Sequence, residues 1–446
     1  MRKSVRHLAI DILNQVCQSH SFAGDLLDSC LDSNSLSGTP DGRLLTHLVY
    51  GVLRLRAHLD WILTKLYSGN FEKMDEVIKN VLRLGIYQLK FSDRLPDFAV
   101  VNEAVKIAKV LKPDRSALVN AVLRNYLRRG QNLPFPSPEK KPAEYIAAFH
   151  SHPLWLVKKW IKMFGTEETI SLCSANNELP LLTARVNTLK ISRKDLMQKL
   201  IVAGFTPEAT EYSPDGIILK ASTSPLQKTD FFKSGFLRLQ DEAAQLISYL
   251  IKPDTNETIL DACAGSGGKA THLAAILKNK GRIVAMDRNP GKIAELKSEA
   301  TRLGINIETQ TGDLEIGLHD SLKEKFDYVL VDAPCSGTGT LRRNPEIKWR
   351  ITQKDLRKIT AVQKIILQNA STAVKKGGYL IYCTCSLLSE ENENIVDDFL
   401  KLYPDFSLCR PTEPIYRQLI CGPGLFHTYP HRHKMDGFFG AVLKYQ

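Results

Sequence analysis

Several features that would assign a chain to a special class are missing from this sequence. No apolar run approaches the roughly 18 residues that a membrane-spanning helix requires, so no membrane partner is expected. The N-terminus is charged and leads into an amphipathic pattern, which is not typical of a secretory signal. No internal repeat or low-complexity tract is present. A chain of 446 residues with 43% hydrophobic and 24% charged residues is therefore expected to form a soluble multidomain protein.

The nine cysteines lack the spacing of a disulfide framework or of a zinc ribbon. Several fall inside apolar runs, where a reduced thiol serves as a small hydrophobic residue. This distribution favours a reducing cytoplasm and predicts no metal site. The formal net charge of +12 favours a polyanionic partner such as a nucleic acid, but it is also compatible with an ordinary solvated basic surface.

The hydrophobic pattern divides the chain into four parts. From Val5 to about Arg129, apolar residues recur at three- and four-residue steps, which predicts an all-α bundle. A stretch with four prolines between 134 and 142 cannot continue a helix and marks a linker. The predicted boundaries are 1–130 for the bundle, 131–179 for the linker and its connecting helices, 180–240 for a small α+β module, and 241–446 for a C-terminal α/β domain.

Two parts of this division rest on changes of period. In the small module, strand candidates at 182–189 and 216–220 flank an amphipathic helix from Ser192 to Ala203, with Leu196, Leu200 and Ile201 facing inward. In the C-terminal domain, helices alternate with strands, as is typical of a mostly parallel sheet covered on both faces. Its six predicted strands are 259–262, 282–287, 306–310, 328–332, 379–384 and 437–443.

Basic side chains lie where these patterns would expose them to RNA phosphates, although an ordinary solvated face is the alternative. Trp349, which lies among one group of them, could stack on a base. The main positions are Arg54, Arg83 and Arg124 in the bundle, Arg185, Lys190 and Lys199 in the module, and Arg342, Arg343, Lys348 and Arg350 after the fourth strand of the C-terminal domain.

A glycine-rich turn follows the first predicted strand of the C-terminal domain, and such a turn lets the backbone approach a ligand closely. Asp287 ends the second strand, where a carboxylate accepts ribose hydroxyls, and Asp313 ends the third, where it could receive an adenine amino group. These features predict a nucleotide-type cofactor pocket. The glycine spacing also satisfies a relaxed NAD pattern, which leaves an NAD-dependent oxidoreductase as an alternative. The residues of the turn are Cys263, Ala264, Gly265, Ser266, Gly267, Gly268 and Lys269.

Two thiols follow neighbouring strands of this predicted sheet. Cys335 comes just after Asp332 at the end of the fourth strand, and Cys385 comes just after the fifth, with Cys383 suited to packing inside it. The carboxyl ends of parallel strands form the ligand crevice, so the two thiols could face one substrate. Hydride transfer has no use for such a pair. Methylation of cytosine does, because a thiolate must add to carbon 6 before carbon 5 becomes nucleophilic.

Seven short segments carry a family resemblance that extends over essentially the whole chain. They are Val49–Arg54, Arg185–Leu189, Asp332–Gly339 with Arg342–Pro345, Thr384–Ser386 followed by Glu390–Asn392, and Asp436–Phe439. In these segments the chain resembles the bacterial small-subunit rRNA cytosine-5 methyltransferases of the RsmB (Sun) family. The resemblance implies a NusB-like helical domain, an RNA-recognition-like module, and a Rossmann-like methyltransferase domain that uses S-adenosylmethionine.

The resemblance also implies roles for individual residues. Cys385 would be the nucleophile, Cys335 would assist release of the methylated product, and Asp332 would hold the cytosine and neighbour the methyl donor. The turn from Cys263 to Lys269, with Asp287, Asp313 and Asp332, would bind S-adenosylmethionine. One departure is that the usual family turn, Ala-Pro-Gly-Gly-Lys-Thr, reads Gly-Ser-Gly-Gly-Lys-Ala here, so Ser266 lacks a proline's stiffness.

The expected partner is small-subunit rRNA, with no DNA, in a cytoplasmic protein that acts as a monomer. Three other readings stay open at this point. The chain could methylate cytosine in tRNA, it could methylate cytosine in 23S rRNA, or it could be a non-catalytic RNA-binding assembly factor.

Overall fold

A computed structural model describes residues 3–19, 21–92, 95–130, 133–220, 226–254, 256–411, 413, 416 and 418–446. The chain forms two compact units, one of Met1–Leu179 with Leu341–Arg350 and one of Pro180–Thr340 with Ile351–Gln446. Over the described ranges, no helix is both long enough and apolar enough to span a bilayer.

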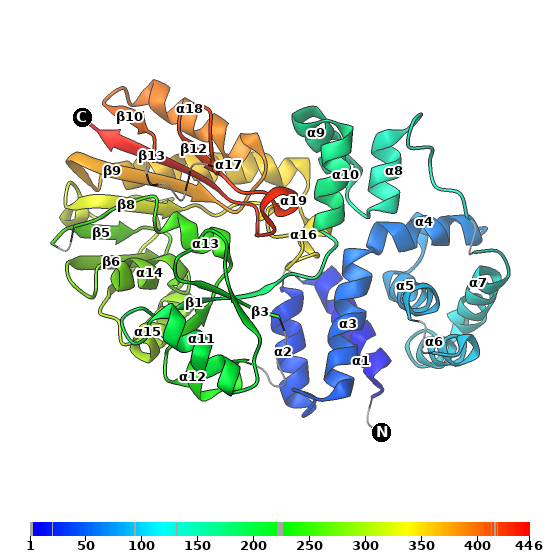
Figure 1. The fold of residues 1–446 in the computed structure, drawn as a ribbon. Coiled ribbons are helices and arrows are strands. Elements are labelled where there is room, and N and C mark those ends of the chain that lie inside the picture. The colour runs from blue at the N-terminus through cyan, green and yellow to red at the C-terminus, as the bar shows by residue number, and fades with distance from the viewer. Residues whose placement is uncertain are drawn as a thin grey trace. The chain divides into compact units, whose positions relative to one another are not determined.

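The first unit is helical, as the sequence predicts (Figure 1). Side chains cap the start of three of its helices: Ser4, Thr39 and Asp75 accept hydrogen bonds from the first-turn amides of α1, α3 and α5. Their apolar faces form one hydrophobic core. The bounds are α1 Val5–Gln18, α2 Ala23–Ser33, α3 Pro40–Arg54, α4 Arg56–Leu66, α5 Glu76–Phe91, α6 Asp97–Leu111, α7 Ser116–Arg129, α8 Pro142–Phe149, α9 Leu154–Phe164, α10 Thr166–Ala175 and α16 Ile347–Arg350.

Two arginines that were expected on solvated faces of the bundle are buried instead. Arg83 is 2% exposed and donates to Asp60 at 2.6 Å and to Asn80 at 2.8 Å. Arg54 donates to the carbonyl of Arg342 at 3.1 Å. Their assignment to RNA phosphates is wrong, because each guanidinium satisfies groups inside the unit.

The segment Leu341–Arg350 groups with the helical unit although the residues on either side of it belong to the other unit. Lys348 is 2% exposed, and its Nζ donates to the carbonyl of Ser151 at 3.1 Å. The indole Nε1 of Trp349 donates to the carbonyl of Leu53 at 2.7 Å. The prediction that Lys348 holds a phosphate is therefore wrong, whereas stacking of the partly exposed Trp349 ring on a base stays a prediction. Both side chains anchor the segment within the helical unit.

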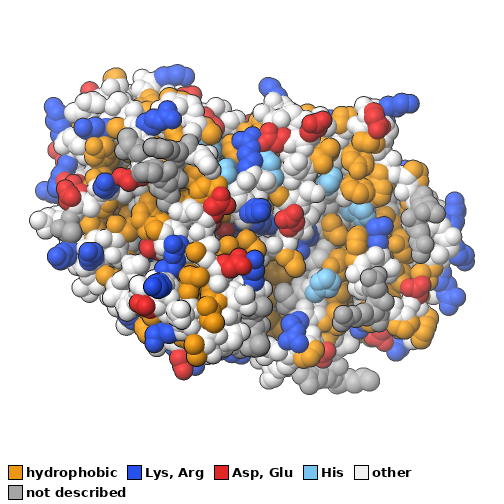
Figure 2. Space-filling view, viewed as in Figure 1, with side chains coloured by type: hydrophobic (Ala, Val, Ile, Leu, Met, Phe, Trp, Pro, Cys, Tyr) orange, Lys and Arg blue, Asp and Glu red, His pale blue; other side chains and the backbone are white. Residues whose placement is uncertain are grey.

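The basic side chains do not mark one continuous path on the face drawn in Figure 2. Lys and Arg side chains lie dispersed there among Asp and Glu. The net charge of +12 therefore does not by itself locate an RNA-binding surface on the described part of this face.

The second unit begins with a small antiparallel sheet of strand order β2-β3-β1-β4. Ser192 caps α11, and Leu196 and Leu200 are buried as predicted. Ile201 is 56% exposed, so its predicted inward position is wrong, because it follows the buried Leu200 around the helix by one residue. The bounds are β1 Leu182–Val186, α11 Arg193–Val202, β2 Pro207–Ala209, β3 Gly216–Leu219, α12 Asp230–Lys233 and β4 Leu237–Leu239.

The larger sheet of this unit has the order β11-β12-β13-β9-β8-β5-β6-β7, and β10 pairs with β13. Five neighbouring strands of this sheet are parallel, namely β9, β8, β5, β6 and β7. The next strand, β13, runs antiparallel to β9. The bounds are β5 Thr258–Asp261, β6 Arg282–Asp287, β7 Glu308–Thr311, β8 Phe326–Asp332, β9 Val374–Thr384, β10 Phe406–Cys409, β11 Ile420–Cys421, β12 Leu425–His427 and β13 Phe439–Tyr445.

Helices cover both faces of this sheet (Figure 1). In β8, Val329 and Val331 pack into one core with Leu367 of α17, whereas Leu330 packs into another with Leu273 of α14. This leaves the carboxyl edge of the sheet open for a site. The helices are α13 Glu242–Ile247, α14 Gly268–Ile276, α15 Pro290–Leu303, α17 Gln353–Ser371, α18 Glu393–Leu402 and α19 Pro430–His433.

Candidate active site at the carboxyl edge of the parallel sheet

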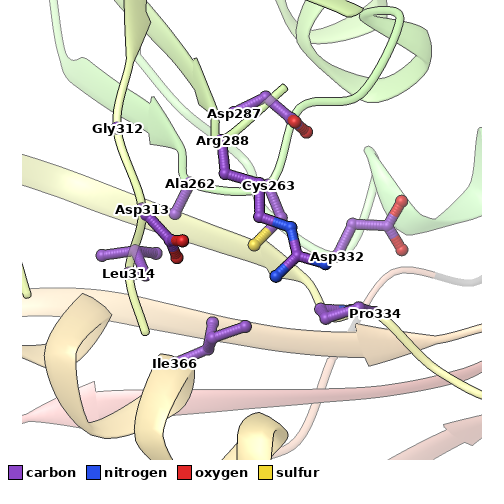
Figure 3. A pocket seen from close by; sticks show the side chains of 10 residues that line it. All are labelled: Ala262, Cys263, Asp287, Arg288, Gly312, Asp313, Leu314, Asp332, Pro334 and Ile366. Atoms are coloured by element: carbon purple, nitrogen blue, oxygen red, sulfur yellow. The ribbon is translucent and has the colours of Figure 1, made fainter. Parts of the chain in front are cut away.

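A cavity of about 200 Å³ lies at the carboxyl ends of β5, β6, β7 and β8 and against α17 (Figure 3). Four residues predicted for cofactor binding line it, namely Cys263, Asp287, Asp313 and Asp332. The other predicted turn residues, 264–269, are not among the residues that line it. The lining also includes six residues that were not predicted: Ala262, Arg288, Gly312, Leu314, Pro334 and Ile366.

The acids of this cavity suit S-adenosylmethionine, which carries hydroxyl groups and a sulfonium cation. The Asp287 carboxylate accepts the amides of Gly265 and Asn289, each at 2.8 Å, and keeps further lone pairs for ribose hydroxyls. The carboxylates of Asp313 and Asp332 line the same cavity. Carboxylates can accept the ribose hydroxyls and the amino groups of this cofactor, so the residues present fit it.

Asp332 is held by Lys269 from the start of α14. The Lys269 Nζ forms an ion pair with one carboxylate oxygen of Asp332, and Cys383 Sγ lies 3.6 Å from the other. Burial alone would lower the pKa of Lys269, but the adjacent Asp332 carboxylate outweighs it and raises that pKa. The lysine therefore stays charged and orients the carboxylate. In the sequence Lys269 belongs to the predicted cofactor turn, and nothing there indicates this contact with Asp332.

The two thiols predicted to share a substrate lie side by side. Cys335 Sγ and Cys385 Sγ are 3.3 Å apart. The parallel register of β8 and β9 pairs Asp332 with Cys383, so the residues after each strand leave the sheet at the same level. Cys383 is buried, in agreement with its expected packing role. The neighbouring Cys385 thiol and burial both raise the pKa of Cys335.

A buried carboxylate joins the loops that carry these thiols. Glu391 is 0% exposed and accepts the amide of Ser336 at 2.7 Å. It also accepts the hydroxyls of Ser336 and Ser386. Because each serine directly follows one of the cysteines, Glu391 fixes both loops with a single side chain. In the sequence Glu391 belongs to the motif Glu390–Asn392, which indicates no role for this side chain.

Gly339 shows how tightly these loops interlock. Its amide donates to the carbonyl of Cys385 at 2.9 Å, and its carbonyl accepts the amide of Gly437 at 2.8 Å. A Cβ atom at position 339 would lie 1.9 Å from the Gly437 carbonyl oxygen. Only glycine fits there, which explains why the segment from Asp436 to Phe439 belongs with the thiol motifs.

Three family models match the chain. The model described as 16S rRNA methyltransferase RsmB/F matches residues 248–444. The NusB family matches residues 3–128, and a ferredoxin-like domain of RsmF/B-like methyltransferases matches residues 152–225. These matches agree with the predicted helical bundle, small module and methyltransferase domain.

Individual relatives cover the same span. The probable ribosomal RNA small subunit methyltransferase B of Bacillus subtilis (strain 168) is 35% identical over 453 residues, which cover 99% of each chain. The ribosomal RNA small subunit methyltransferase B of Escherichia coli O127:H6 is 32% identical over 445 residues, again with 99% of each chain covered.

Solved structures share the fold. The crystal structure of the protein PH0851 matches with a TM-score of 0.84 and 25% identity over 99% of each chain. NSun6 from Pyrococcus horikoshii, solved with SFG, matches with a TM-score of 0.59 and 22% identity over 67% of this chain and 99% of its own. Taken together, these matches show that the chain belongs to the ribosomal RNA small subunit methyltransferase B family and is an S-adenosylmethionine-dependent rRNA methyltransferase.

Proposed function

We propose that this protein methylates carbon 5 of a cytosine in small-subunit rRNA through a covalent adduct with Cys385. The observation that carries the proposal is the pair of thiols 3.3 Å apart beside the cavity that Asp332 lines. The family membership favours methyl transfer over the NAD-dependent alternative. The thiol pair favours it too, because hydride transfer gives neither thiol a role.

In the proposed reaction, the Cys385 thiolate adds to carbon 6 of the cytosine, and the displaced electron pair makes carbon 5 nucleophilic. S-adenosylmethionine supplies the methyl group that carbon 5 takes. A base then removes the proton from carbon 5, and the electrons of that bond expel the Cys385 thiolate. This sequence restores the aromatic ring and the free enzyme.

The neighbouring thiol suits the last step. The raised pKa of Cys335 keeps it protonated at neutral pH, so its S–H can donate to the sulfur of Cys385 at 3.3 Å. Such a donor stabilises the departing thiolate and speeds release of the product. Asp332, oriented by Lys269, would hold the cytosine ring, and the turn with Asp287 and Asp313 would hold the cofactor.

The substrate base must leave its stack to reach this edge of the sheet, at a cost of about a few kcal/mol. We infer that the protein acts as a monomer in the cytoplasm, with rRNA and not DNA as its partner. The domain boundaries at residues 130, 179 and 240 stay predictions from the sequence.

The experiment that tests the proposal is transfer of radiolabelled methyl to unmodified small-subunit rRNA, followed by nucleoside analysis, with 23S rRNA and tRNA in parallel. Label in 5-methylcytosine on the small-subunit RNA alone is the expected result. Label on tRNA or 23S rRNA would overturn the substrate but keep the reaction. No transfer to any of these RNAs would favour a non-catalytic assembly factor.

A further inference from the structure

The cofactor turn has little rigidity of its own. It runs from Gly265 to Gly268 with only Ser266 between glycines, and Gly265 and Gly267 have left-handed φ values of +53° and +83°. No proline restricts it. Its shape nevertheless matters, because the amide of Gly265 donates to Asp287 at 2.8 Å and Asp287 lines the cavity.

An arginine from the small module holds the middle of this turn. Arg238 lies on β4, and its Nη2 donates to the carbonyl of Ser266 at 3.0 Å and to the hydroxyl of Ser266 at 3.2 Å. Glu299 on α15 lies 3.5 Å from Nη1 of the same guanidinium and is itself held by Arg302 at 2.6 Å. Glu299 thus holds the Arg238 guanidinium in place, and the guanidinium donates its hydrogen bonds to Ser266.

A second arginine holds the end of the turn from the adjacent strand. Arg185 on β1 is the register partner of Arg238 on β4. Its Nη1 donates to the carbonyl of Gly268 at 2.7 Å, and its Nη2 donates to the hydroxyl of Thr271 at 3.0 Å. Arg185 is 1% exposed, so its predicted contact with RNA is wrong. Side chains directly opposite in an antiparallel pair point to the same face, which brings both guanidinium groups to the turn.

We propose that Arg238 and Arg185 are positioning residues that keep the cofactor turn in the shape that binds S-adenosylmethionine. The small module is then part of the cofactor site as well as a module beside it. The hydrogen bonds from Arg238 restrict the turn at Ser266, a position where no proline restricts the backbone. This inference rests on the proposed role of the turn in cofactor binding.

The test uses Arg238→Met in the full chain, because methionine keeps most of the apolar stem and loses the donors. The dissociation constant for S-adenosylmethionine should rise about 10-fold to 100-fold, which corresponds to about one hydrogen bond from a charged donor, because the turn loses its support without losing a direct ligand contact. The KM for the cofactor should rise with it, whereas kcat at saturating cofactor and the KM for rRNA should stay within about 2-fold.

Arg282→Met is the matched control. Arg282 pairs with Glu308 on the surface at the first residue of β6, the opposite end of that strand from the cavity. It also removes one guanidinium from the same unit, and cofactor affinity should not change. Ser266→Ala is a milder second variant that removes only the hydroxyl contact. It should weaken binding about 2-fold to 5-fold in the parent and have no effect beside Arg238→Met.

Three outcomes would overturn the inference. Unchanged cofactor affinity in Arg238→Met is the first. A fall in kcat at constant KM is the second, because it indicates fewer folded molecules and not a misshapen turn. Full additivity of the two variants is the third. If the parent protein bound no S-adenosylmethionine, or if Asp287→Ala did not weaken its binding, the proposed function itself would fail.

Discussion

The thiol loops and the cofactor turn lie at the same edge of one sheet but are held in different ways. The thiol loops are joined by one carboxylate, Glu391, which sits within the methyltransferase domain and accepts from the residue after each cysteine. The cofactor turn is held by Arg185 and Arg238 from the small module. Chemistry and cofactor affinity should therefore respond to different substitutions.

The substitution with the largest expected effect removes the nucleophile. Cys385→Ala should lower methyl transfer at least about 1,000-fold, because carbon 5 of cytosine stays unreactive without an adduct. Its affinity for S-adenosylmethionine should equal that of the parent, since Cys385 is not among the residues that line the cavity. Single-turnover methyl transfer and calorimetric binding measure the two halves. Full activity in this variant would rule out the proposed mechanism.

Breaking the tie between the thiol loops should have the next largest effect. Glu391→Gln replaces an oxygen that accepts two serine hydroxyls with a group that donates at one end, so the loops should separate. We expect kcat to fall about 10-fold to 100-fold and stability to fall by about 1–3 kcal/mol. Cofactor affinity should stay within about 2-fold, as measured by steady-state kinetics with titration calorimetry. A rise in cofactor KM with unchanged kcat would mean that Glu391 supports the cofactor turn and not the thiol loops.

Asp261 lies between the thiol loops and the cofactor turn. It ends β5, just before the cofactor turn, and it interacts electrostatically with Asp332. Burial, with a further contribution from the Asp332 charge, raises the pKa of Asp261 to about 7 from 3.8. The folded state thus favours the protonated acid. This contribution to stability is complete below about pH 4 and is lost as pH rises through 7.

Asp261→Asn should remove that dependence, since an amide does not titrate. The melting temperature of the variant relative to the parent should increase between pH 5 and pH 8, by a few degrees. Calorimetric or fluorescence melting at several pH values measures this difference. A constant difference across that range would show that Asp261 is ionised in the folded protein throughout.

The sequence predicts the strands of the larger sheet that carry long apolar runs, and β6 is found at the predicted residues 282–287. The order of these strands along the chain was also enough to bring Cys335 and Cys385 to one edge. The strands β10, β11 and β12 were missed, because they are only two to four residues long and, unlike β5 and β7, do not fall within the alternation of helices and strands that predicts the parallel sheet.

The partners of buried charges could not be predicted in the same way. Arg185 and Lys348 look like surface cations in the sequence, yet each donates to a group far along the chain. Arg185 donates to the carbonyl of Gly268, 83 residues away, and Lys348 donates to that of Ser151, 197 residues away. Glu391 reaches Ser336 across 55 residues. A long side chain can cross a layer of the fold, and only the packed structure shows which carbonyls or hydroxyls form hydrogen bonds with it.

The most direct test of the central claim is to trap the adduct. Cys335→Ala keeps the nucleophile but removes the donor 3.3 Å from it, so the adduct should form and be released slowly. Incubation with small-subunit rRNA and S-adenosylmethionine should then give a protein–RNA band that survives denaturing electrophoresis. The double variant Cys335→Ala/Cys385→Ala should give none. A band that persists in the double variant, or one that forms with Cys385→Ala alone, would contradict the assignment of Cys385 as the nucleophile.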